Sequence, residues 1–444
     1  GLASGLALLI YTGLVLVILN AFEVTLTLPG IAGIILGIGM AVDANVIIFA
    51  RVREEMVRGR SVKNSLKIGF QKALSAILDG NITTLIAAVV LWFKGSGTVK
   101  GFAQTLAIGI IASMFTALVI TRLIVNAFYA VGLRSEKLYY RPKKEREPID
   151  FLSKKKVFFT ISLVLIAAGV ITIGVNAGRG KGAFAYSLEF QGGTSTNVTF
   201  DKDYSIDEID KEIVPVVEKV TGDNNVQTQK VAGTNQVIIK TVTLDLDKRE
   251  ALNKAMADNF GVDESKITAE NISSTVSNEM RRDAVIAVVI ATICMLLYIW
   301  FRFKDIRFAT SAVLALLHDV LVVVGFYAIA RISVGNTFIA CMLTIVGYSI
   351  NATIVIFDRI REEMRGKTKS SDVAAVVNKS ITQTLTRSIY TSLTTFIMVA
   401  VLYVMGVSSI KEFALPLMVG VVCGAYSSVC ITGALWYVMK RFKK

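Results

Sequence analysis

Ten apolar runs, each long enough to cross a membrane, limit the fold of this chain more than any other feature. They lie at about residues 2–22, 31–50, 76–93, 101–128, 157–177, 284–301, 308–330, 336–357, 382–404 and 413–438. Hydrophobic residues make up 53% of the 444, which is more than a soluble protein could keep away from water. The sequence therefore predicts a polytopic α-helical membrane protein with about ten transmembrane helices.

The basic residues gather in alternate connections between these runs. The Lys- and Arg-rich segments are 51–72, 134–156, 302–307, 358–381 and 440–444. The remaining short connections carry only four basic residues, namely Lys94, Lys100, Arg331 and Lys411. This asymmetry follows the rule that basic loops stay in the cytoplasm, and it argues against nucleic acid as the reason for the net charge of +14. We therefore expect both chain ends to be cytoplasmic.

One long polar segment, at about 178–283, lies between the fifth and sixth runs and is expected outside the membrane. Residues 186–200 alternate as a strand, and Ser205-x-x-Glu208 forms a capping box that opens a helix near 206–220. Strand, strand, helix and strand then fit 224–231, 235–244, 246–259 and 266–276. The order β-α-β-β-α-β predicts an extracytoplasmic ferredoxin-like α+β domain.

The membrane segments of the chain are repeated. Residues 42–56 (VDANVIIFARVREEM) return 308 positions later as 350–364 (INATIVIFDRIREEM), with eight of fifteen positions identical. The match extends so that 1–128 parallels 309–438, with four runs in each copy and the same orientation. Parallel repeats predict two pseudo-symmetric halves, with any transport path near their interface.

Asp43 is the residue of this repeat that points most directly to function, because the second copy has Asn351 in its place. It lies seven residues inside the helix end predicted at Ala50, roughly 10 Å deep at the helical rise. An ionised carboxylate is costly there unless it meets a cation or water, and such a group can load and release a proton. A structural hydrogen bond to a neighbouring helix is the alternative.

Three other polar residues inside apolar runs are candidate members of a proton relay. Arg387 could offset the charge of Asp43 across the two halves, or it could extend to the membrane surface. His318 and Asp319 lie near the middle of their run, where they could form a relay or a local hydrogen bond. Both interpretations stay open for each group.

Other residues in the runs favour structural roles. Asp79 and Arg122 lie near the basic ends of their runs and are expected to anchor the membrane surface. Gly33, Gly37 and Gly39 are expected to permit close helix packing. The four cysteines have no ligand spacing, so we predict no metal site, and the single histidine, His318, leaves no nucleophile arrangement for an enzyme.

Several long motifs resemble those of one family, SecD and SecF. Residues 27–56 are similar to the fourth-span motif of SecD, and 95–110 to the motif entering its last span. Residues 186–194 (YSLEFQGGT) resemble the Gly-Gly motif that opens the outer domain of SecF. Residues 315–319 and 347–362 are similar to its membrane motifs. The chain is identified as a member of the SecDF family, within the resistance-nodulation-division (RND) superfamily.

The resemblance implies a division of the chain into five parts. They are a SecD-like membrane half of four spans at 1–130, a basic cytoplasmic linker at 131–155, the first SecF-like span at 156–178, the extracytoplasmic domain at 179–282, and a SecF-like membrane half of five spans at 283–444. The chain begins with Gly1, and the first two spans and large outer domain of SecD do not appear in it. We therefore expect it to begin within a longer protein or to belong to a split system.

The resemblance also implies a function. It predicts an accessory subunit of the Sec protein translocase in the bacterial cytoplasmic membrane, using the proton-motive force to promote export of preproteins. The implied partners are the SecYEG channel, the SecA motor, unfolded preproteins and, as a further candidate, a YajC-like subunit. No cofactor is implied. The family's acid falls on Asp43 and its arginine on Arg387, but its second acid is replaced by Ala352.

Two other functions remain as alternatives. A proton-driven exporter of small molecules or lipids from the same superfamily usually carries two large outer domains, whereas this chain predicts one. A non-conducting assembly scaffold of the translocase would not need Asp43.

Overall fold

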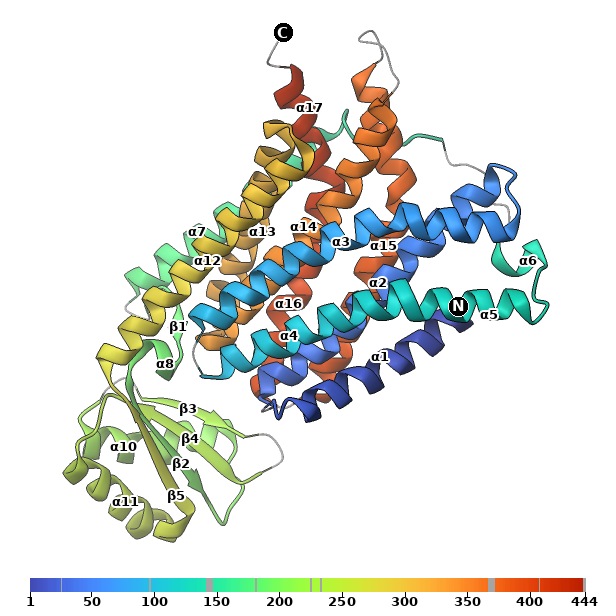
Figure 1. Ribbon diagram of the computed structural model, residues 1–444. Coiled ribbons are helices and arrows are strands. Elements are labelled where there is room, and N and C mark those ends of the chain that lie inside the picture. Colours follow the sequence, from blue (N-terminus) through green and yellow to red (C-terminus); the bar gives the residue numbers. More distant parts are fainter. Residues whose placement is uncertain are drawn as a thin grey trace.

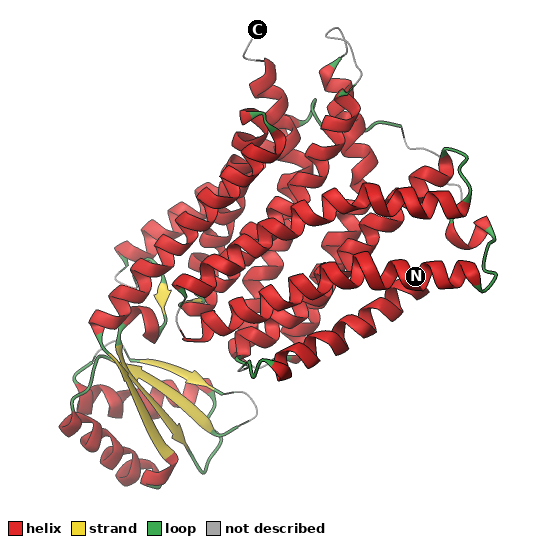
Figure 2. Ribbon diagram, viewed as in Figure 1, coloured by secondary structure: helices red, strands yellow, loops and turns green. Residues whose placement is uncertain are grey.

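The computed structural model places ten long helices side by side, with an α+β domain beyond one end of them (Figures 1 and 2). It describes residues 1–24, 26–95, 97–140, 147–179, 182–223, 226–231, 234–365, 372–406 and 408–441. Residues 141–146 of the predicted linker lie outside the described residues. In the described part, ten helices are long and apolar enough to cross a membrane, which confirms the predicted polytopic fold.

Both halves have the same order of elements. The first half contains α1 (Leu2–Ala21), α2 (Leu28–Val57), α3 (Val62–Lys94), α4 (Gly97–Phe115), the π-helical segment η1 (Thr116–Ile120) and α5 (Thr121–Ala130). The second contains α13 (Ile306–Ala330), α14 (Asn336–Met364), α15 (Val373–Met405), α16 (Ser408–Tyr426), η4 (Ser427–Thr432) and α17 (Gly433–Arg441). Even the π-helical segment recurs in the last span of each half, so the predicted repeat is a repeat of structure.

Two further spans connect these halves to the α+β domain. The short helix α6 (Glu136–Tyr139) follows the first half, and α7 (Lys155–Gly178) then leads to the domain. The helix α12 (Ser274–Phe303) returns from it to the second half. Much of the apolar surface of α7 and α12 is exposed, as expected for helices that face lipid.

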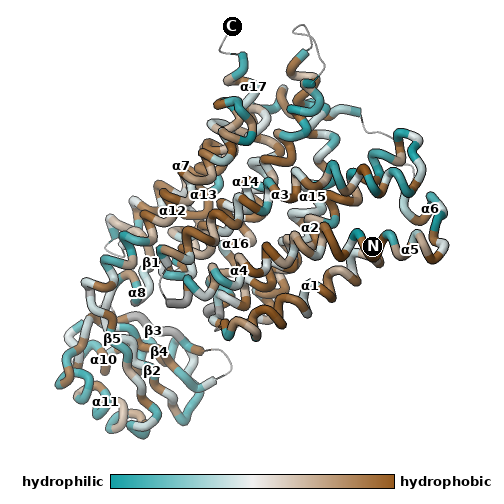
Figure 3. The backbone as a smooth tube through the Cα atoms, in the orientation of Figure 1, coloured by the Kyte–Doolittle hydropathy of each residue, from teal (hydrophilic) through white to brown (hydrophobic). Residues whose placement is uncertain are grey.

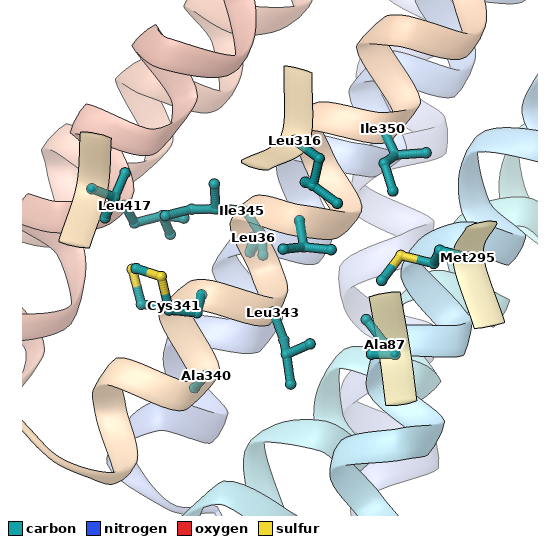
Figure 4. Close-up of a cluster of buried hydrophobic side chains, with 14 of the residues drawn as sticks. Leu36, Ala87, Met295, Leu316, Ala340, Cys341, Leu343, Ile345, Ile350 and Leu417 are labelled. Carbon is teal, nitrogen blue, oxygen red and sulfur yellow. The ribbon is translucent and has the colours of Figure 1, made fainter. Parts of the chain in front are cut away.

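The helix α14 is the most deeply buried span and forms the centre of the bundle. Figure 4 shows apolar side chains from α2, α3, α12, α13 and α16 gathered around it, among them Leu36, Ala87, Met295, Leu316 and Leu417. A helix that is surrounded by protein in this way is apolar on most of its circumference.

Glycines allow the two halves to approach closely. Gly39 of α2 packs against Thr395 of α15, and the equivalent Gly347 of α14 packs against Thr84 of α3. A Cβ atom at Gly347 would lie only 3.1 Å from the Thr84 backbone. Within the first half, a Cβ atom at Gly33 would lie 2.8 Å from Thr105 Oγ1 and one at Gly37 would overlap the Tyr11 hydroxyl, so the predicted packing role is confirmed for these two glycines.

The α+β domain is a four-stranded antiparallel sheet with helices on one face (Figure 2). Its strands are β2 (Gly193–Thr199), β3 (Gln227–Lys230), β4 (Gln236–Thr241) and β5 (Ile267–Ile272), in the spatial order β3-β4-β2-β5. Its helical elements are α9 (Ile206–Glu208), η2 (Ile209–Ile213), α10 (Val214–Thr221), α11 (Leu246–Phe260) and the short 3-10 helix η3 (Glu264–Lys266). This is the strand order of a ferredoxin-like fold, as predicted.

The predicted capping box is present at the first helix of this domain. The Ser205 N–H donates to the Glu208 carboxylate at 2.8 Å, and the Glu208 N–H donates to the Ser205 hydroxyl at 3.3 Å. The Lys202 ammonium and Ser205 lower the pKa of the Glu208 carboxyl to about 2. The box therefore fixes the point at which the chain turns from β2 into helix.

The strand predicted over 186–200 is wrong in its first half. The chain there forms β1 (Ala185–Tyr186) and the short helix α8 (Leu188–Gln191) before β2 begins. Gly192 and Gly193 have φ angles of 75° and 133°, which residues with a Cβ rarely adopt, so the Gly-Gly pair turns the chain into β2. Strand β1 pairs in parallel with β6 (Ser333–Val334), which joins the base of the domain to the α13–α14 connection.

The two halves diverge toward one end of the bundle. In Figure 1 the α2–α3 connection lies at the right and α17 ends at the top, whereas the opposite ends of the halves lie together on the side of the α+β domain. Figure 3 shows apolar middle segments and more hydrophilic ends. We call the diverging end, which carries Arg51, Lys72, Arg302 and Arg365, the basic end.

A buried carboxylate site between the two halves

Asp43 of α2 and Asn351 of α14 contact each other. The Asn351 side-chain amide donates a hydrogen bond of 3.2 Å to Asp43 Oδ2. These residues occupy equivalent positions of the repeat, 308 residues apart. When two similar halves are related by a two-fold axis, equivalent residues can contact each other only near that axis. The predicted interface between the halves therefore passes between these two side chains.

Asp43 shares a small cavity with Arg387 of α15. The cavity measures about 10 Å³, space for about one water molecule, and is lined by Asp43, Tyr348, Asn351, Ala352, Val355, Arg387, Ser388 and Thr391. Asp43 Oδ1, Asn351 Oδ1 and Arg387 Nη2 are buried there without a hydrogen-bond partner among the described residues. The carboxylate and guanidinium attract each other across the cavity, and the described contacts include no direct ion pair between them.

Each helix supplies its part of this site for a local reason. Gly80 of α3 has no side chain, and a Cβ atom there would overlap the Asn351 amide, so glycine leaves the space that Asn351 occupies. The Tyr348 hydroxyl donates to Ser392 at 3.3 Å and connects α14 to α15. The site is consequently built from both halves, with the acid from the first and the cation from the second.

The structure brings Asp43 and Arg387 together but places Asp319 in another cluster. Asp319 of α13 is fully buried and contacts His318 Nδ1 at 2.9 Å. The Ser349 and Ser427 hydroxyls both donate to its Oδ2, the second at 2.7 Å. Among the described contacts, none joins this cluster to Asp43 or to Arg387.

The Asp319 cluster belongs to the second half alone. By the repeat, its residues Asp319, Ser349 and Ser427 correspond to Tyr11, Ala41 and Thr116 of the first half. The Tyr11 hydroxyl is buried without a hydrogen-bond partner in the described part of the chain. The two halves therefore differ at a second polar position besides Asp43.

Another buried acid within an apolar run was not predicted. Asp79 of α3, which the sequence suggests as a surface anchor, is 5% exposed and forms an ion pair with Arg302 of α12. Arg302 Nε lies 2.9 and 2.7 Å from the two carboxylate oxygens, and the Tyr298 hydroxyl donates to Oδ1 at 2.8 Å. This corrects the anchoring prediction. The available signal was an acid inside an apolar run, whose partner lies 223 residues away.

Comparison with known proteins identifies the family. The profile described as "Protein export membrane protein SecD/SecF, C-terminal" matches residues 2–130 and 252–442. The protein translocase subunit SecDF of Bacillus subtilis is 35% identical over 99% of this chain and 61% of its own length. The SecF subunit of Petrotoga mobilis is 36% identical over 67% of this chain and 98% of its own length.

A solved structure shows the same fold. The crystal structure of SecDF from Thermus thermophilus, described as a translocon-associated membrane protein, superposes with a TM-score of 0.86 at 33% identity, over 99% of this chain and 59% of that one. The chain spans about 53 to 61% of the length of the curated SecDF relatives it matches. By sequence and by fold, the chain belongs to the SecD/SecF family of protein export membrane proteins.

Proposed function

We propose that this chain works as part of a Sec translocase accessory subunit that uses the proton-motive force to promote export of preproteins. The names of its relatives support a role in protein export. The partners we propose are the SecYEG channel, the SecA motor, unfolded preproteins and a YajC-like subunit. In this arrangement the basic end and both chain ends face the cytoplasm, and the α+β domain lies outside.

The observation that carries proton coupling is the position of Asp43. Its carboxylate accepts a hydrogen bond from Asn351 and faces Arg387, so it is attracted to two helices of the other half when ionised. Protonation removes this charge and weakens both interactions, which allows the halves to move relative to each other. One charge that crosses 100 mV supplies about 2.3 kcal/mol, enough to shift such an equilibrium.

Movement of the halves would reach the α+β domain through two connections. The domain continues directly into α12, whose basic end is held to α3 by the Arg302–Asp79 ion pair. Strand β1, at the base of the domain, also pairs with β6 of the α13–α14 connection. Rocking at Asp43 would therefore change the position of the domain, where an emerging preprotein would be met.

The test is Asp43→Asn in the full chain, reconstituted with the translocase in vesicles that carry a proton gradient. We expect the variant to lose the gradient-dependent part of export while it inserts and folds normally. Asp258→Asn, which removes an exposed acid of α11, is the matched control and should export like the parent chain.

Three outcomes separate the possible functions. Undiminished gradient-dependent export by Asp43→Asn would refute the proposal. Export that depends on the chain but not on Asp43 or the gradient would indicate a scaffold. Loss of small-molecule or lipid efflux on removal of the chain, with secretion unaffected, would indicate an exporter.

A further inference from the structure

A second and larger cavity lies at the basic end, between the two halves. It measures about 350 Å³ and is lined by Arg51, Lys72, Ser75, Ala76, Arg302, Asp358, Arg361, Glu362 and Arg365. These residues come from α2 and α3 on one side and from α12 and α14 on the other, at the end where the halves diverge in Figure 1. We call it the basic cavity.

Cations outnumber anions in this lining. Five of its side chains are Arg or Lys and two are acidic. Three of the cations already have carboxylate partners, since Arg51 contacts Glu54 and Glu362, Lys72 contacts Glu55, and Arg302 contacts Asp79.

The other two cations, Arg361 and Arg365, have no ion pair among the described residues. Arg361 donates once, to the Arg302 carbonyl at 3.4 Å, and lies over the Phe303 ring. No described side-chain contact involves Arg365. A guanidinium has five N–H donors in a planar fork, so most of the donors on this pair are free to bind. Arg361 lies in the last turn of α14, Arg365 directly follows the helix with extended backbone, and both line the same cavity.

We propose that the basic cavity binds a phosphate group, held by Arg361 and Arg365 between the two halves. Arginine pairs bind phosphate oxygens in a bidentate geometry, and the cavity is large enough for a phosphate with a glycerol attached. The cavity lies at the basic end, which the proposed orientation places at the cytoplasmic membrane surface, and basic pockets between helices on that side of a membrane bind anionic headgroups. The ligand is therefore a phosphate monoester or diester, supplied by an anionic lipid or by a soluble compound.

The helix dipole offers another explanation for arginines at this position, but it does not account for the whole arrangement. The last turn of α14 attracts cations, because helix carbonyl ends carry partial negative charge. That attraction needs only nearby charge, as at Lys440 and Arg441 of α17, and it does not require two guanidinium groups that line one shared cavity. The cavity is what distinguishes Arg361 and Arg365 from the basic residues at other helix ends.

The experiment compares ligands on the purified full chain in detergent. Phosphatidylglycerol should raise the unfolding temperature by several degrees, and native mass spectrometry should show lipid retained through washing. Phosphatidylcholine, which has no net charge, should do neither. Inorganic phosphate, added at about 10 mM, tests whether a soluble phosphate compound binds in place of the lipid headgroup.

Two variants and one control locate the binding. Arg361→Gln with Arg365→Gln should abolish the shift, and Arg365→Gln alone should weaken binding about tenfold without disturbing other described contacts. Lys63→Gln with Lys67→Gln removes two exposed cations with the same spacing from α3 and should leave the shift intact. Asp43→Asn should also leave it intact, which separates this inference from the proposed function.

Each outcome has a definite meaning. A shift with phosphatidylglycerol alone supports an anionic lipid as ligand, and a shift with phosphate alone supports a soluble phosphate compound. Absence of any shift with both ligands overturns the proposal. So does a shift that persists in the double arginine variant, or one that the Lys63 and Lys67 variant removes equally.

Discussion

At the scale of single residues, the Asp319 carboxylate depends on hydroxyl donors from two other elements. Removing one donor leaves a fully buried carboxylate with an unmet acceptor, and a hydrogen bond to a charged group contributes about 1.5–3 kcal/mol. We expect Ser427→Ala to lower the unfolding temperature of the detergent-solubilised chain clearly, because Ser427 donates to Asp319 at 2.7 Å.

Tyr11→Phe is the control for this prediction. Tyr11 occupies the position equivalent to Asp319 in the first half, and its hydroxyl has no hydrogen-bond partner in the part of the chain that the structure describes. Loss of that hydroxyl should change the unfolding temperature little. Equal destabilisation by the two variants would show that Asp319 does not need its hydroxyl donors.

The sequence predicted some of these residue contacts and not others, for a physical reason. The repeat itself indicated that Asp43 lies near the interface of the halves, and Arg387 was a candidate cation from the other half. Nothing in the local sequence of Asp79 reveals Arg302, because that ion pair depends on how α12 packs against α3. Buried polar groups are satisfied by tertiary contacts that local patterns do not contain.

At the scale of elements, the segment before α7 is held to α15 by Asn378 and, through one bond from the Ile149 N–H at 2.9 Å, by the Thr382 hydroxyl. Asn378 Oδ1 accepts from the N–H groups of Phe151 and Leu152 at 3.2 Å, and its amide donates to Asp150 at 2.8 Å. These bonds contribute about 1 kcal/mol each. We expect Asn378→Ala to release the segment and to speed tryptic cleavage after Lys154 about tenfold or more.

The matched control for this prediction is Asn64→Ala, which changes an exposed asparagine of α3. Its cleavage rate after Lys154 should equal that of the parent chain. Unchanged cleavage in Asn378→Ala would mean that other contacts hold the segment.

The same segment is expected to loosen in acid. Hydrogen bonds from the Ser153 N–H and the Asn378 amide lower the pKa of the Asp150 carboxyl below its ordinary value of 3.8. Because the pKa is lower when the segment is docked, the ionised Asp150 carboxylate stabilises the docked state at pH values above 3.8. This stabilisation is lost as the pH falls through the lowered pKa of the docked state. The protection of the amides of residues 149–153 from exchange, relative to the intrinsic rate at each pH, should therefore fall below about pH 4, and Asp150→Asn should remove this pH dependence.

The elements themselves could be predicted to different extents. The apolar runs gave the ten spans, but α3 begins 14 residues before its run because Val62, Leu66, Phe70 and Ala73 bury one face of an amphipathic start. The alternation after residue 186 indicated a strand, whereas the positive φ angles at the Gly-Gly pair allow a helical turn first. Periodicity describes which side chains are buried and does not locate such turns.

At the scale of the whole molecule, the Asp79–Arg302 pair connects the first half to the helix that carries the α+β domain. Removing one partner of a buried ion pair costs about 3–5 kcal/mol, since the other charge stays buried. We expect Arg302→Gln to destabilise the chain strongly and to make exchange at the basic end of α12 faster.

A double-mutant cycle checks this prediction. Asp79→Asn combined with Arg302→Gln should be less destabilising than the sum of the single changes, because neither partner is then left as an unpaired charge. Strict additivity in thermal unfolding would contradict a direct ion pair. The sequence predicted two similar halves, but their divergence at the basic end depends on inter-helix packing that the repeat does not specify.

The contact between Asp43 and Asn351 has a consequence for how such a protein can arise from a duplicated gene. Two identical copies arranged about an axis would place the same side chain opposite itself, and two carboxylates at hydrogen-bond distance cannot both be ionised. A duplication that kept aspartate in both copies would hold one shared proton between them. Replacement of the aspartate in one copy by asparagine leaves a single acid at the axis, which no longer shares its proton with a second carboxylate. One substitution at the axis is therefore enough to give the two copies different roles.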